Sequence, residues 1–100
     1  KAHRLGGIEV NEETVEVLVD GKAVKVTPIE FKILLLLIQN PGRVFPAEEI
    51  YERVWNERAV NTDTVMVHIR NLREKIEVNP REPKYIKVVW GVGYKIEKQP

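Results

Sequence analysis

The chain has 100 residues, 43% of them hydrophobic, which is enough for one modest core and therefore for one domain. It has no cysteine and two histidines, a composition that excludes a disulfide framework, a thiolate zinc site and a cysteine nucleophile. The longest apolar run, residues 33–38, is too short to cross a bilayer, and the first residues lack the apolar stretch of a signal peptide. We therefore expect a cytoplasmic protein without a membrane partner.

Basic charge is concentrated in the last third of the chain. Residues 1–67 carry 8 Lys/Arg and 11 Asp/Glu, whereas residues 68–98 carry 8 and 4, so a formal net charge of +1 conceals a division into −3 and +4. Such asymmetry indicates a polyanionic partner, because phosphate contacts supply most non-specific affinity for nucleic acids. A solvated basic surface explains the charge about equally well, so other features must decide.

The first part of the chain alternates apolar and polar residues, which is typical of half-buried strands. The alternating apolar residues are Ile8 and Val10, then Val15, Val17 and Val19, then Val24 and Val26. Residues 11–13 and 20–22 separate these runs, and the Asp20-Gly21 pair favours a tight hairpin. The pattern predicts a small antiparallel sheet.

The next segment has a complete helix start. Thr27 and Glu30 are spaced for a reciprocal capping box, and Pro28 suits the first helical position. The helix is predicted to run to about Gln39 and to end at residues 40–42. Its buried stripe is predicted to consist of Phe31, Leu34, Leu35 and Ile38.

A second, shorter helix is predicted over residues 47–54. Residues 43–45 form an extended connector, and Pro46 then opens the helix. Glu48 and Glu49 are placed favourably against the helix dipole. Residues 55–60 are predicted to form a loop.

The third helix is predicted to begin at Asn61 or Thr62 and to end before Asn79-Pro80. Its buried stripe consists of Val65, Ile69, Leu72 and Ile76. The positions opposite that stripe are Asp63, Val67, Arg70 and Glu74, with Met66 and Asn71 on the shoulders and His68 and Arg73 beside the core face. Residues 85–90 and 94–96 then form a hairpin around a turn at residues 91–93.

The third helix carries groups that suit a DNA major groove. Its arginines, Arg70 and Arg73, and its Asn71 offer paired hydrogen-bonding groups to base edges. Lysine, histidine and threonine side chains, such as Lys75 and His68, suit phosphates. The helix by itself is a weak signal. The order of three helices followed at once by a hairpin with Lys87 and Lys95 is stronger, because it places two groove-binding elements side by side.

An organised catalytic or cofactor site is not evident. Glu48 and Glu49 point to different faces of one helix, and no hydroxyl nucleophile has an evident His and carboxylate escort. The Gly91-Val92-Gly93 run lacks the strand-to-helix context of a phosphate loop. We therefore expect no enzyme activity and no cofactor. We also expect no metal site, because His68 has only one other histidine in the chain, and that one is distant.

Several motifs considered together resemble one family. Residues 64–76, Tyr85-Ile86 and residues 91–94 look like the recognition helix and wing of the OmpR/PhoB-type response-regulator effector domain. Residues 27–31 and Trp55 resemble its other signatures, so the resemblance covers essentially the full chain. It implies an α+β winged helix-turn-helix fold with a four-stranded amino-terminal antiparallel sheet, a three-helix core and a carboxy-terminal β-hairpin wing.

The resemblance also implies a function and partners. Residues 1–100 would form the effector domain of a two-component response regulator, with a receiver domain upstream that a cognate sensor kinase phosphorylates. Tandem head-to-tail copies would bind direct repeats in promoter DNA and regulate transcription. Since no long apolar seam remains once the core stripes are assigned, we expect the isolated domain to be monomeric.

The resemblance places the family's base contacts at Met66 and Asn71 and its phosphate contacts at Asp63, His68, Arg70 and Arg73. The full predicted DNA-binding surface is Thr62, Asp63, Thr64, Met66, Val67, His68, Arg70, Asn71, Arg73, Lys87, Trp90, Gly91 and Tyr94. The loop that resembles the segment facing RNA polymerase includes Trp55, Asn56, Glu57 and Arg58.

Three residues depart from the family pattern. Asp63 stands where a basic residue is frequent, and Pro46 stands where Ser or Thr commonly caps the second helix. Trp90 stands where many members have an arginine that enters the minor groove. Because large aromatics beside a turn usually stabilise the hairpin, we expect Trp90 to pack on the wing and third helix rather than against DNA sugars. The alternative function is a winged-helix module whose partner is a protein.

Overall fold

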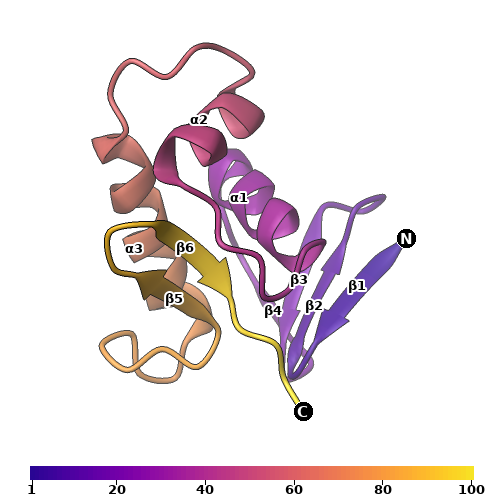
Figure 1. Ribbon diagram of the computed structural model, residues 1–100. Coiled ribbons are helices and arrows are strands. Elements are labelled where there is room, and N and C mark those ends of the chain that lie inside the picture. Colours follow the sequence, from indigo (N-terminus) through magenta and orange to yellow (C-terminus); the bar gives the residue numbers. More distant parts are fainter.

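The computed structural model describes residues 1–100 and contains two sheets and three helices (Figure 1). The strands of the first sheet are β1 (Ala2–Leu5), β2 (Ile8–Asn11), β3 (Glu16–Val19) and β4 (Lys22–Val24). The helices α1 (Pro28–Ile38), α2 (Ala47–Trp55) and α3 (Asp63–Ile76) follow, and the strands β5 (Ile86–Val89) and β6 (Gly93–Ile96) form the terminal hairpin. This order confirms the predicted α+β winged-helix architecture.

The amino-terminal sheet is an antiparallel meander in the order β1-β2-β3-β4. The alternating pattern did not indicate β1, because none of its four residues is fully buried; only the family resemblance implied a fourth strand. Val15 was predicted within a strand, but it lies in the turn before β3 with a φ of 56° and is 59% exposed. Val26 likewise follows the end of β4.

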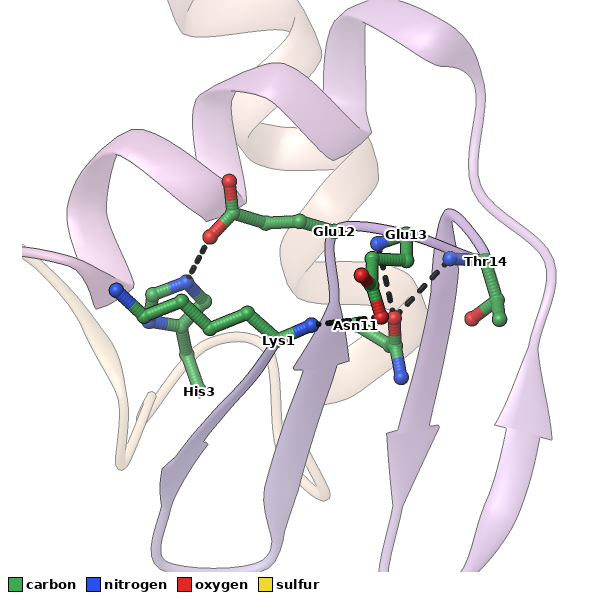
Figure 2. Close-up of polar contacts among 6 residues, drawn as sticks. All are labelled: Lys1, His3, Asn11, Glu12, Glu13 and Thr14. Carbon is green, nitrogen blue, oxygen red and sulfur yellow. Dashed lines mark hydrogen bonds and ion pairs between the residues drawn. The ribbon is translucent and has the colours of Figure 1, made fainter.

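The turn between β2 and β3 is held by local polar contacts, which explains why β3 begins only at Glu16 (Figure 2). The Asn11 Oδ1 accepts the backbone N–H groups of Glu13 and Thr14 at 2.9 and 3.0 Å. Glu12 pairs with His3 of β1, and this hydrogen bond lowers the pKa of the Glu12 carboxyl. The side chain of Asn11 therefore extends the turn to Val15.

Helix α1 begins with the predicted capping box. The Thr27 Oγ1 accepts the Glu30 N–H at 3.2 Å, and the Glu30 Oε1 accepts the Thr27 N–H at 3.0 Å. The buried apolar face is broader than the predicted stripe, and Leu35 is only partly buried. Its buried members are Phe31, Ile33, Leu34, Leu37 and Ile38. The face is broad because α1 lies between the sheet and the other two helices (Figure 1).

Helix α2 is one residue longer than predicted. Pro46 is its N-cap and provides no side-chain hydrogen bond, as its lack of a hydroxyl requires. Trp55 was predicted in the following loop, but it ends the helix and stacks on Tyr51 with ring centroids 4.7 Å apart. Asn56 then stops the helix in a left-handed conformation with a φ of 57°.

The wing, defined as β5, β6 and the turn between them, is fastened to the connector before α2. Phe45 and Tyr94 exchange backbone hydrogen bonds of 2.8 and 2.9 Å, so the predicted extended connector pairs with β6. Gly93 permits this approach, because a Cβ at that position would lie 2.0 Å from the Phe45 carbonyl oxygen. Gly91 supplies the turn with a φ of 74°.

One hydrophobic core joins all these elements. It contains 18 buried residues drawn from the amino-terminal sheet, the three helices, the connector and the wing, so the chain folds around a single centre. No helix is both long enough and apolar enough to span a bilayer.

Candidate nucleic-acid interface

Helix α3 divides into a buried and an exposed face, as its periodicity predicts. Its buried stripe is confirmed, since each of its four residues is at most 2% exposed: Val65, Ile69, Leu72 and Ile76. The exposed residues on the opposite face and its shoulders are Asp63, Met66, Val67, Arg70, Asn71 and Glu74. The helix therefore presents a continuous outward surface on a rigid support.

A buried carboxylate of α1 anchors α3 from behind. Glu30 is 2% exposed, and its Oε1 accepts a hydrogen bond from the Lys75 Nζ at 2.5 Å. Burial raises the pKa of Glu30, but the hydrogen bonds from Lys75 and from the Thr27 N–H outweigh burial and leave that pKa lower than usual. Lys75, which suited a phosphate contact in the sequence, is therefore already paired within the protein.

His68 lies between α3 and α2 rather than wholly on the outer face. It is half-buried, and its ring is tilted against the Trp55 indole with centroids 5.6 Å apart. Its Nδ1 is buried without a hydrogen-bond partner. Only part of this predicted phosphate ligand is therefore accessible from outside.

Arg73 connects α3 to the wing. Its Nε donates to the Ile86 carbonyl oxygen of β5 at 3.1 Å. Burial lowers the pKa of its guanidinium, and the neighbouring Tyr94 and Glu77 partly oppose that shift. A residue that the family resemblance assigns to phosphate binding also links α3 to the hairpin.

Glu77, just after α3, organises the segment that leads into the wing. The side chain is buried, and its carboxylate accepts the backbone N–H groups of Lys84, Tyr85 and Ile86 at 2.8, 3.1 and 2.8 Å. The sequence analysis did not identify this role. A lone acid at the end of a helix carries no signal for partners seven to nine residues later.

The wing tip differs from the prediction. Trp90 was expected to pack on the wing and α3, but it is 92% exposed. Trp90 immediately precedes Gly91, which turns the chain with a positive φ. Of the two wing lysines, Lys95 pairs with Glu97 at 2.9 Å, whereas Lys87 has no ion-pair partner.

A groove separates α3 from the wing, and this α3–wing groove brings predicted site residues together. It has a volume of about 290 Å³. Its lining residues are Met66, Ile69, Arg70, Arg73, Val88, Trp90 and Tyr94. Residues more than twenty positions apart in the chain thus form one surface that is apolar along its walls and carries two guanidinium groups.

A second hollow, lined mainly by charged residues, lies beside the same helix. It is lined by Arg70, Arg73, Glu74, Pro80 and Arg81. Arg81 was not among the predicted site residues, although it contributes to the basic excess after residue 67. Nothing in its local sequence indicates that the loop after α3 folds back beside Arg70.

The remaining predicted residues lie around this surface or beyond it. Thr62 and Thr64 are half-buried at the start of α3, where Thr62 makes no capping hydrogen bond. Gly91 is exposed in the wing turn, and Tyr94 is half-buried in β6. Asn56, Glu57 and Arg58 are exposed in the loop between α2 and α3, at one end of the molecule (Figure 1).

Unpaired positive charge is a property of this end of the chain. Between residues 68 and 98, only Lys75 and Lys95 form ion pairs. The other cations there, which form none, are Arg70, Arg73, Arg81, Lys84, Lys87 and Lys98. An exposed helix face, a neighbouring hairpin and unpaired cations together define a winged-helix module suited to a polyanion.

Comparison with known proteins agrees with this class. The chain belongs to the family described as transcriptional regulatory protein, C terminal, whose profile matches residues 21–96. It is 57% identical over 79 residues to the regulatory protein VanRc of Enterococcus gallinarum, an alignment that covers 78% of this chain and 34% of VanRc. The chain therefore spans about a third of the length of that relative.

Solved structures show the same fold. The response regulator DrrB of Thermotoga maritima, an OmpR/PhoB homologue, superposes with a TM-score of 0.88 at 33% identity, over 96% of this chain and 44% of DrrB. The DNA-binding domain of the response regulator AdeR, solved in complex with an intercistronic region, gives a TM-score of 0.79 at 28% identity. That alignment covers 93% of this chain and 96% of the AdeR domain.

Proposed function

We propose that this chain binds double-stranded promoter DNA sequence-specifically and regulates transcription, with α3 in the major groove and the wing at the minor groove. The observation that carries the proposal is the outward face of α3, where Arg70 and Asn71 are exposed and Arg70 has no ion-pair partner. The AdeR domain, which shares the fold, was solved with an intercistronic region, and this supports the assignment.

The contacts are proposed to divide between positioning and reading. Arg70 and Lys87 are unpaired cations on the two elements, so they would bind phosphates and set the register. Asn71 can pair with an adenine through its donor and acceptor. The remaining predicted contacts would complete the surface: Thr62, Asp63, Thr64, Met66, Val67, His68, Arg73, Trp90, Gly91 and Tyr94.

The setting of the domain is also a proposal. Because the chain spans about a third of VanRc, we infer a longer response regulator in which a receiver domain precedes residues 1–100 and a sensor kinase phosphorylates it. The exposed loop at Asn56, Glu57 and Arg58, with Trp55 at its base, would face RNA polymerase. The domain would act through binding alone, without catalysis or cofactor.

Selection of duplexes from a random pool, followed by titration at several salt concentrations, tests DNA binding. We expect an enriched sequence and an affinity that falls steeply with salt, because phosphate contacts release counterions. Arg70→Ala should weaken binding to selected and unrelated duplexes alike. Asn71→Ala should cost roughly 1–3 kcal/mol on the selected sequence and little elsewhere.

Salt-independent or absent duplex binding would exclude the proposal and favour a protein-binding winged helix. The assembly on DNA is tested separately, by comparing direct and inverted repeats of the selected site at equal spacing. The head-to-tail arrangement predicts tighter binding to direct repeats by a protein that is monomeric in solution. Tighter binding to inverted repeats would contradict that arrangement.

A further inference from the structure

Exposed apolar side chains gather on the proposed DNA-binding elements. Eight large hydrophobic residues are exposed in the whole chain, and five of them lie on α3 and the wing: Met66, Val67, Val88, Trp90 and Val92. The other three, Val15, Val60 and Val78, lie singly in separate turns and loops. Isolated exposed apolar residues are ordinary, whereas a cluster on a binding surface indicates an apolar feature of the ligand.

The first half of α3 presents mainly apolar chemistry outward. Its exposed side chains are Asp63, Met66 and Val67, and the two apolar ones are each 46% exposed. In a helix docked in the major groove, these amino-terminal positions meet base edges. Neither Met66 nor Val67 can supply the strong hydrogen bonds that read purine edges. The apolar group that base pairs display in the major groove is the 5-methyl group of thymine.

The surrounding charge selects DNA over an apolar protein partner. Met66 lines the α3–wing groove together with Arg70 and Arg73, neither of which has an ion-pair partner. An apolar protein surface docked there would remove the exposed Arg70 guanidinium from water without compensation, which is costly. A DNA strand compensates this guanidinium with phosphates while its bases approach Met66 and Val67.

We propose that Met66 and Val67 recognise thymine 5-methyl groups, so that the preferred duplex carries thymine where the first half of α3 enters the major groove. This inference rests on the proposed function and adds the chemistry by which part of the sequence is read. Asn71, one turn further along, would supply the hydrogen-bonded part of the readout.

Replacing thymines by deoxyuridine tests the inference directly. The two bases pair identically and differ only by the 5-methyl group, so each thymine of a selected duplex is replaced singly on either strand. We expect one or two replacements to weaken binding about fourfold each, the effect of losing one buried methyl group. Replacements elsewhere in the duplex should leave the affinity unchanged.

Protein variants then assign each methyl group to a side chain. Met66→Ala should remove the deoxyuridine penalty at one position, and Val67→Ala should remove it at the same or a neighbouring position. Met66→Leu should retain the penalty, because it keeps an apolar side chain of similar size. Val15→Ala, at an exposed valine in the turn between β2 and β3, is the matched control and should keep every penalty.

The outcomes separate this inference from the proposed function. If no duplex is enriched, DNA binding itself fails. If a duplex is enriched but no deoxyuridine weakens binding, or if the penalties persist in both Met66→Ala and Val67→Ala, DNA binding stands and methyl recognition is excluded. Circular dichroism of each variant shows that it is folded, as expected for changes at exposed positions.

Discussion

Helices α1 and α3 both bury apolar side chains in the core, yet they serve different purposes. In α1, a capping box satisfies the start and the apolar residues are buried against both the sheet and the other helices. In α3, only one stripe is buried, the cap residue Thr62 makes no side-chain hydrogen bond, and Arg70 faces outward unpaired. The comparison shows that charged groups such as Arg70, which have no partner within the fold, are the ones available to a ligand.

The largest expected effect is on the stability of the fold, and it differs between substitutions in α1 and in α3. Leu34→Ala in α1 leaves a cavity at a residue that is 0% exposed, and it should lower the free energy of unfolding by about 3 kcal/mol. Val67→Ala in α3 is the matched change at an exposed site and should alter it by no more than roughly 0.5 kcal/mol. Urea unfolding measures both, and equal losses would contradict the contrast.

Breaking the Glu30–Lys75 contact between the two helices is expected to have a smaller effect on stability, and this effect depends on pH. Glu30→Gln removes the charge that pairs with Lys75, and it should cost about 1–2 kcal/mol at pH 7, because Lys75 stays partly solvated. The folded-state pKa of Glu30 lies below its ordinary value of 4.5. Its contribution is therefore present above pH 4.5 and is lost as the pH falls through the folded-state pKa.

Urea unfolding measured at pH 7, 4.5 and 3 tests whether the contribution of Glu30 is lost as the pH falls. The unmodified protein should lose more stability on acidification below pH 4.5 than Glu30→Gln does, because the variant has no carboxyl to protonate at this site. An identical acid dependence for the two proteins would show that the Glu30–Lys75 pair does not contribute.

At the wing tip, we expect a substitution to change the affinity for DNA and to leave the stability of the fold nearly unchanged. Because Trp90 is 92% exposed, Trp90→Ala should shift the melting temperature by no more than about 3 °C. Its indole is free to lie against DNA, so affinity for a selected duplex should fall about fivefold, as expected for the loss of partial apolar burial. A lower melting temperature with unchanged affinity would instead assign Trp90 to hairpin stability.

The smallest expected effect concerns Arg81 in the loop after α3. Arg81 shares a hollow with Arg70 and is unpaired, so we expect it to bind one additional phosphate. Arg81→Ala should reduce the slope of log affinity against log salt by about one. Lys22→Ala, at an exposed lysine of β4, is the control and should leave the slope unchanged. The same slope for both variants would remove Arg81 from the interface.

Local sequence patterns predicted much of this protein. The capping box at Thr27 and Glu30, the buried stripe from Val65 to Ile76 and the hairpin at residues 85–96 all follow from interactions between near neighbours. Alternation did not reveal β1, because this short edge strand has no buried face. Alternation also assigned Val15 to a strand, because the pattern does not show that the Asn11 side chain extends the turn. Periodicity and turn chemistry therefore predicted strands, three helices and a terminal hairpin, and the family resemblance supplied the winged-helix fold.

The interface itself depends on tertiary structure. Sequence placed Arg70, Asn71 and Met66 on an exposed helix face and predicted a hairpin directly after that helix, and the family resemblance identified the hairpin as a wing. Only the folded chain paired Lys75 with Glu30, which lies 45 residues away, and left Arg70 unpaired. It also turned Trp90 outward and brought Arg81 beside Arg70. The physical reason is that ion pairing and exposure depend on partners distant in the chain, whereas periodicity reports only a residue's own helix or strand.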